Sequence, residues 1–136
     1  MWAHFHHEAD IGVRGIGHTR EQAFEEAGIA LTAVITNPDS VRCAESVTLD
    51  CEAPDPELLF VDWLNALVYE MAIRKMLFSR FHVEFDGPCL HATACGEAID
   101  VARHRPAAEV KGATYTELEL REDEPGKWRA QCVVDV

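Results

Sequence analysis

A helix pattern in the middle of the chain constrains the fold most strongly. Asp55 suits the N-cap position and Pro56 the first helical position, where proline's missing N–H leaves no bond unmade. Apolar side chains follow at helical spacing, which predicts an amphipathic helix that ends near Lys75. The apolar stripe consists of Leu58, Leu59, Phe60, Trp63, Leu64, Leu67, Val68 and Met71. We expect this helix, and Trp63 in particular, to pack into the core.

A second helix is predicted earlier in the chain. Thr19 is followed three residues later by Gln22, which is the form of a capping box. The run Asn37–Pro38–Asp39 should end this helix, because proline cannot continue it. Its apolar face comprises Ala23, Phe24, Ala27, Leu31 and Val34.

Alternation of apolar with polar or small residues predicts strands around these helices. We expect them at residues 11–16, 41–51, 78–85, 89–99, 114–121 and 128–136. Turns at 86–88 and 123–126 would join the last four strands into two hairpins, and 103–106 is expected to be a loop. The chain is therefore predicted to be one α+β domain over residues 1–136. Its mixed, mainly antiparallel β-sheet layers would be covered by two α-helices.

Composition and charge restrict the functions that are open to this chain. Hydrophobic residues make up 48% of the sequence, which is enough to build a core. Twelve basic and 24 acidic residues give a formal net charge of −12, and there is no basic run. Because nucleic-acid binding depends on cations that contact phosphates, we expect no direct binding of nucleic acid. A role in RNA metabolism would run through a protein partner or a metal; alternatively, the acidity only keeps the protein soluble.

The cysteines and the N-terminal sequence bear on the cellular compartment. Five cysteines, at 43, 51, 89, 95 and 132, form no C-x-x-C pair and fit no zinc spacing. We predict that they are reduced thiols of a cytosolic protein. The first residues lack the pattern of a signal peptide, and no apolar run approaches the roughly 18 residues that span a bilayer. A cytoplasmic protein without membrane contact is expected.

Carboxylates near both ends of the chain form a candidate metal site. Asp135 stands next to the α-carboxylate of Val136, and residues 7–12 supply another carboxylate. If the fold brings these segments together, their oxygens would suit Ca²⁺, Mg²⁺ or Mn²⁺. Three residues cannot fill a calcium shell of about six to eight ligands, so water or a partner would complete it.

Two other uses of these residues remain open. His4, His6 and His7 could bind a transition metal together with Asp10, although an ordinary surface strand is favoured because no second histidine-rich segment exists. A metal-bound water held by Asp10 and Asp135 could instead attack a phosphoester. Hydrolytic two-metal sites usually carry more carboxylates than these, so hydrolysis ranks lower.

Several motifs, in order and at similar spacings over nearly the whole chain, resemble the archease family. They are His7-Glu8-Ala9-Asp10-Ile11-Gly12, the run from Glu57 to Tyr69 with Trp63-Leu64-Asn65, Cys95-Gly96-Glu97, Glu109-Val110-Lys111-Gly112-Ala113-Thr114-Tyr115, and the ending Trp128…Asp135-Val136. Glu8 departs from this pattern, since the family usually has threonine there.

The resemblance implies an accessory protein of the GTP-dependent tRNA-splicing RNA ligase, which promotes guanylylation of the ligase and its repeated turnover, and not an enzyme itself. It implies a strand-helix-strand-strand module with a second inserted module. It also implies a divalent ion, Ca²⁺ above all, held by Asp10, Asp135 and Val136. The lysine of the Glu-Val-Lys segment matches Lys111.

Two residues of the motif at 109–115 also have an interpretation from the residues alone. From the residues alone, Lys111 would be an ordinary lysine that reaches solvent. The resemblance instead assigns it a contact with a nucleotide phosphate or an acidic group of the ligase. Tyr115 is predicted to bury its ring in the core.

Overall fold

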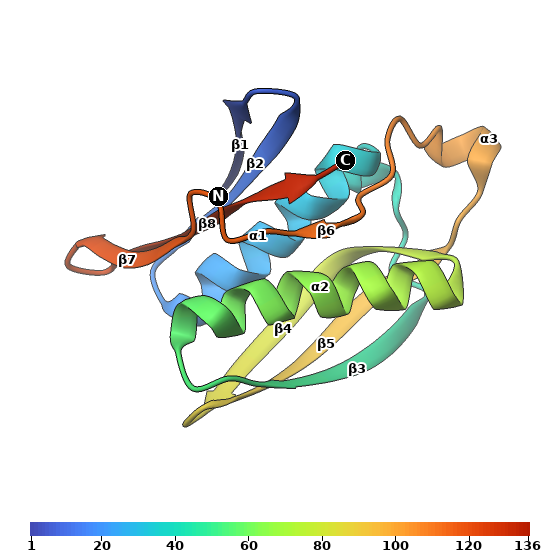
Figure 1. Ribbon diagram of the computed structural model, residues 1–136. Helices are drawn as coiled ribbons and strands as arrows, with labels where there is room; N and C mark the ends of the chain where they lie inside the picture. The colour runs from blue at the N-terminus through green and yellow to red at the C-terminus, as the bar shows by residue number, and fades with distance from the viewer.

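Residues 1–136 are described by a computed structural model (Figure 1). The helices are α1 (Arg20–Ile35), α2 (Pro56–Arg74) and the short α3 (Val101–His104), with a 3-10 helix η1 (Pro38–Ser40). The strands are β1 (Trp2–His7), β2 (Asp10–Gly17), β3 (Glu45–Glu52), β4 (Met76–Asp86), β5 (Cys89–Ala98), β6 (Gly112–Ala113), β7 (Glu119–Glu124) and β8 (Lys127–Asp135).

Both long helices begin at the predicted caps. Thr19 Oγ1 accepts a hydrogen bond from the N–H of Gln22 at 3.1 Å. Asp55 Oδ1 accepts one from the N–H of Glu57 at 2.7 Å. Helix α2 ends at Arg74, and its C-cap residue Lys75 adopts a left-handed conformation with φ 52°. The side-chain oxygens satisfy N–H groups that a helix start otherwise leaves unpaired, which is why local sequence sufficed to place these two starts.

The strands form two separate sheets, and every pairing within them is antiparallel. One sheet has the order β1-β2-β8-β6, with β7 also paired to β8. The other has the order β3-β5-β4. Helices α1 and α2 lie between the sheets: α1 contacts β2 and β4, and α2 contacts β3 and β6 (Figure 1). The predicted α+β class is confirmed.

The core lies around the two helices. Trp63 is fully buried, as predicted, and its indole N–H donates to the carbonyl of Phe24 at 2.9 Å. This bond joins α2 to α1 and leaves no unpaired polar atom on the largest core side chain. Exposed and buried residues alternate along β3, β4 and β5, so one face of this sheet packs on the helices. The other face, which carries exposed residues such as Thr48, His82 and His91, is open to solvent.

Four local expectations differ from the structure. Residues 41–44 precede strand β3 and are irregular, and β7 begins only at Glu119. Residues 103–104 belong to α3, so only the second half of the predicted 103–106 loop is irregular. Tyr115 does not enter the core and is 69% exposed. None of the helices is long and apolar enough to cross a membrane.

Candidate functional site

One end of the five-stranded sheet gathers the segments that carry the candidate metal ligands. Strand β8 lies between β2 and β6, and Ile11 pairs with Val134. Asp10 therefore comes next to the end of β8, where the N–H of Val136 donates to Asp10 Oδ1 over a long 3.4 Å. On the other side of β8, Gly112 pairs with Asp135. The N–H of Lys111 donates to the carbonyl of Asp135 at 2.8 Å.

The segment that meets the carboxyl end is the turn between β1 and β2. The two turn residues are Glu8 and Ala9, because His7 and Asp10 form the last pair of the hairpin. Glu8 is exposed and has a left-handed backbone with φ 51°. The amino terminus itself lies at the other end of β2, where Met1 donates to the carbonyl of Ile16 at 2.8 Å.

The donor atoms at this end are carboxylate oxygens. Asp10 and Val136 are half-buried, whereas Asp135 and Lys111 are exposed. The carboxylate oxygens of Asp10, Asp135 and Val136 are of the donor type that a hard divalent cation prefers. No group of three or more His, Cys, Asp and Glu side chains gathers closely enough to bind a metal.

Helix α2 fixes the strand that follows Lys111. Asn65 Oδ1 accepts a hydrogen bond from the N–H of Ala113 at 2.9 Å. A Cβ added at Gly112 would lie only 3.2 Å from that same oxygen, so glycine allows β6 to approach the helix. Thr114 Oγ1 donates to the carbonyl of Val133 on β8 at 2.8 Å. The sequence motif included Asn65 but gave no sign of this role, which depends on a contact 48 residues away.

The N-terminal histidines lie on β1. His4 Nε2 lies 2.8 Å from the carbonyl of Ala30 in α1, a hydrogen bond that occupies this nitrogen. This contact ties β1 to the helix and gives His4 a structural role.

A second polar cluster joins three segments around Glu97 on β5. Its carboxylate accepts from Arg103 Nη2 at 2.6 Å and from the N–H of Arg42 at 2.7 Å. These bonds, that of Arg103 first, lower the pKa of Glu97 to about 2. His104 is buried and its Nδ1 accepts from the N–H of Asp100 at 2.9 Å. The ring's other nitrogen, Nε2, therefore donates to Glu97 at 3.0 Å in the neutral tautomer.

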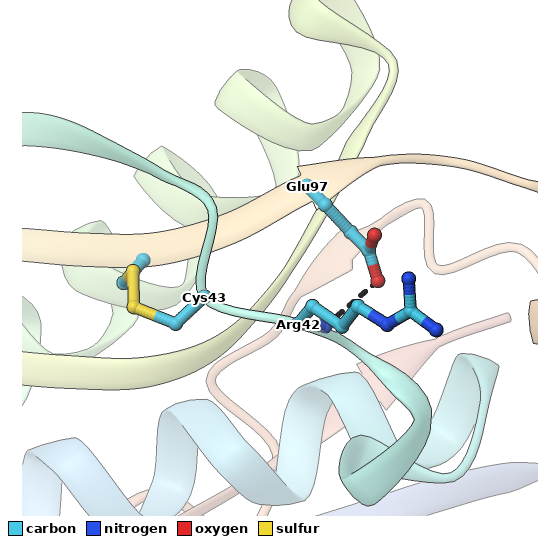
Figure 2. Close-up of a disulfide and its surroundings, with 4 residues drawn as sticks. Arg42, Cys43 and Glu97 are labelled. Atoms are coloured by element: carbon cyan, nitrogen blue, oxygen red, sulfur yellow. Dashed lines mark hydrogen bonds between the residues drawn. A yellow bond between two sulfur atoms is a disulfide. The ribbon is translucent and has the colours of Figure 1, made fainter.

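The prediction that all five cysteines are free thiols is wrong. Cys43 and Cys95 form a disulfide between the irregular segment before β3 and strand β5, with Cα atoms 5.1 Å apart (Figure 2). The two cysteines are 52 residues apart in sequence, and the pairing of β3 with β5 brings them together. Spacing alone cannot show such a contact.

The whole chain matches proteins of one family. The sequence model of the "Archease protein family (MTH1598/TM1083)" matches residues 2–136. The chain belongs to the archease family. It is 37% identical to a protein archease of Pyrococcus abyssi, over 99% of this chain and 98% of that relative. It is 34% identical to the protein archease of Methanosarcina barkeri, over 100% of this chain and 96% of that relative.

Solved archease structures have the same fold. The solution structure of Methanobacterium thermoautotrophicum protein 1598 superposes with a TM-score of 0.83 at 33% identity, covering 99% of this chain and 98% of that one. The Thermotoga maritima protein, described as an archease and possible chaperone, gives a TM-score of 0.63 at 21% identity, covering 97% and 94%. This second likeness concerns the archease fold alone.

Proposed function

We propose that this member of the archease family is an accessory factor of a GTP-dependent RNA-splicing ligase. It would promote guanylylation of the ligase and allow many turnovers in tRNA splicing or RNA repair, in the cytoplasm and without catalysis of its own. The observation that carries this proposal is the convergence of Asp10, Asp135, Val136 and Lys111 at one end of one sheet.

The proposed site combines opposite charges at a solvent-accessible edge. Asp10, Asp135 and the terminal carboxylate would hold a divalent cation, most suitably Ca²⁺, with Mg²⁺ or Mn²⁺ as alternatives. The exposed ammonium of Lys111 lies on the segment bonded to Asp135. It could contact a nucleotide phosphate or a carboxylate of the ligase. An incomplete metal shell that a partner group completes suits a transient protein–protein contact.

The net charge of −12 supports the same proposal. A ligase that binds RNA presents a basic cleft, and an acidic protein can approach that cleft without retaining the RNA. Docking should therefore weaken as salt rises, because salt screens charges on both surfaces. An affinity that stays constant from low to high salt would contradict this part of the proposal.

One reaction separates this proposal from two other functions. Purified ligase is incubated with GTP and metal, with and without catalytic amounts of the protein, and covalently bound guanylate is followed. Stimulation well beyond one equivalent supports the accessory role. Turnover of a phosphoester by the protein without ligase would favour a metal-dependent hydrolase. Suppressed aggregation of unrelated proteins, without stimulation, would favour a general chaperone, the function suggested for the Thermotoga maritima relative.

A further inference from the structure

The disulfide lies where small thiols can reach it. Cys43 is exposed, in the irregular segment between η1 and β3. Cys95 is half-buried on β5, on the sheet face turned away from the helices, since its neighbours Ala94 and Gly96 are the buried ones. Neither of the long helices α1 and α2 covers this face (Figure 1). An incoming thiolate can therefore approach the sulfur of Cys43 more readily than that of Cys95.

The surroundings of Cys95 favour its release. Arg80 on β4 is exposed and lies directly opposite Cys95 in the strand register. Cross-strand partners lie on the same face of a sheet, so a positive charge is carried on the face of Cys95, and positive charge favours a thiolate as the leaving group. The three remaining cysteines lack such help: burial raises the pKa of Cys51 to about 11 and that of Cys132 to about 12, and the pKa of Cys89 is also raised. Exchange chemistry is thus concentrated in the Cys43–Cys95 pair.

The disulfide reinforces a set of bonds that anchor the same short segment. The N–H of Ala44 donates to the carbonyl of Gly96 at 2.9 Å. The N–H of Arg42 donates to Glu97 Oε2 at 2.7 Å, immediately beside the disulfide (Figure 2). Residues 42–44 are exposed and have no strand partner of their own. Their position therefore depends on these two hydrogen bonds and the S–S bond.

Glu97 transmits this anchoring to α3. The helix has only four residues, too few to be stable alone, and depends on its tertiary bonds. Arg103 binds Glu97 with one nitrogen and donates with another to the carbonyl of Ser40 at 2.6 Å. Thr36 Oγ1 donates to the carbonyl of His104 at 2.5 Å. Beyond α3, residues 105–111 run without regular structure to β6. The segment 36–44 and α3 thus share one cluster, whereas Ile99, Ala107 and Lys111 are held by backbone bonds to Lys75, Ile35 and Asp135.

We propose that Cys43 and Cys95 are a reversible thiol–disulfide pair whose oxidation state controls the order of residues 100–105. The thiolate of a low-molecular-weight thiol attacks the sulfur of Cys43, the S–S bond breaks, and its electron pair leaves on Cys95. A second thiolate attacks the small-molecule sulfur of the mixed disulfide, which releases the Cys43 thiolate and a small-molecule disulfide. The protein gains two electrons, and both thiolates take protons from water. Once the disulfide is open, the N–H of Arg42 is bonded to Glu97 less often. The cluster that holds α3 then loses one of its hydrogen bonds.

The first test is selective reduction of the folded protein. The protein is treated with reduced glutathione without denaturant, alkylated and analysed by mass spectrometry. We expect alkylation at Cys43 and Cys95 while Cys51 and Cys132 stay unmodified, and recovery of the disulfide after treatment with oxidised glutathione. A disulfide that opens only when the protein unfolds, or that does not re-form, would overturn the proposal.

The second test measures local order by hydrogen–deuterium exchange. Reduction should speed amide exchange in residues 100–105 by about fivefold or more and leave α2 unchanged, because only local bonds are lost. The double variant Cys43→Ser/Cys95→Ser should show the fast exchange with or without glutathione, and Cys51→Ser should respond like the wild type. The reduced wild type provides the same reading if the double variant does not fold. Equal exchange in the oxidised and reduced proteins would show that the disulfide does not control this segment. Neither measurement depends on the proposed activity.

Discussion

The backbone N–H of Lys111 donates to the carbonyl of Asp135 at 2.8 Å. This bond joins the segment that carries the exposed ammonium to the strand end that carries the proposed metal ligands. Because it uses main-chain atoms only, side chains on either residue can be changed without breaking it. The contribution of each side chain to function can therefore be separated from its contribution to the fold.

Lys111→Ala should lower stimulation of ligase guanylylation roughly tenfold or more, since a charge-assisted hydrogen bond contributes about 1.5–3 kcal/mol. The melting temperature should stay within experimental error, because the side chain is exposed and the bond to Asp135 persists. Lys127→Ala, which removes the same charge from an exposed site at the start of β8, is the matched control. Equal stimulation by the two variants would exclude Lys111 from the partner contact.

A divalent cation bound at the carboxyl end should stabilise the protein. Calcium at about 100 times its dissociation constant should add roughly 2.7 kcal/mol, a shift of roughly 10 °C in melting temperature. Asp10→Asn keeps an oxygen that can accept from the N–H of Val136 but loses the charge, so most of this shift should disappear. Asp135→Asn should act in the same direction.

The control for the metal experiment is Asp62→Asn, at an exposed position on α2. It changes the net charge by the same amount and should leave the calcium-dependent shift intact. If wild type and Asp10→Asn respond equally to calcium in differential scanning calorimetry, the ion is not bound by Asp10. Chelation followed by addition of Mg²⁺ or Mn²⁺ ranks the three cations by the same measurement.

The hydrogen bond from the N–H of Ala113 to Asn65 Oδ1 should hold strand β6 against helix α2. Asn65→Ala removes the acceptor and should cost about 0.5–1.5 kcal/mol in free energy of unfolding, measured by urea denaturation. Amide exchange at Ala113 should rise at the same time. Asn65→Asp keeps an oxygen in that place and should restore most of the protection. Loss of protection in both variants would mean that α2 does not hold β6 through this oxygen.

Local chemistry explains which parts of the fold could be predicted from sequence. Thr19 and Asp55 accept hydrogen bonds from residues two or three positions ahead, so the sequence places both helix starts. The association of Asp10 with the carboxyl end is a condition of the candidate metal site and an implication of the family resemblance, not a result of any local pattern. Its geometry depends on β8 lying between β2 and β6, which no local pattern specifies.

Most of the missed features rest on contacts between distant segments. The disulfide joins residues 52 apart, and Glu97 binds a backbone N–H of Arg42 from 55 positions away. Tyr115 follows β6 in an irregular stretch, where aromatic character alone does not decide burial. Helix α3 has only four residues, too few to show a helical pattern of apolar residues, and it is held by tertiary hydrogen bonds. Propensity and spacing carry no information about such partners.

The cluster around Glu97 predicts how stability changes in acid. The pKa of Glu97 is lowered to about 2 in the folded protein from an ordinary value of 4.5. The charged carboxylate of Glu97 therefore stabilises the fold fully above pH 4.5. This contribution should be lost as the pH falls from 4.5 towards 2, because the unfolded chain takes up the proton first. Urea unfolding of wild type and Glu97→Gln, followed from neutral to acid pH, should show a difference that is constant above about pH 5 and then shrinks. Glu45→Gln, at an exposed glutamate on β3, corrects for the change in net charge. A difference that persists unchanged at pH 2 would show that the cluster acts through packing rather than through the charge of Glu97.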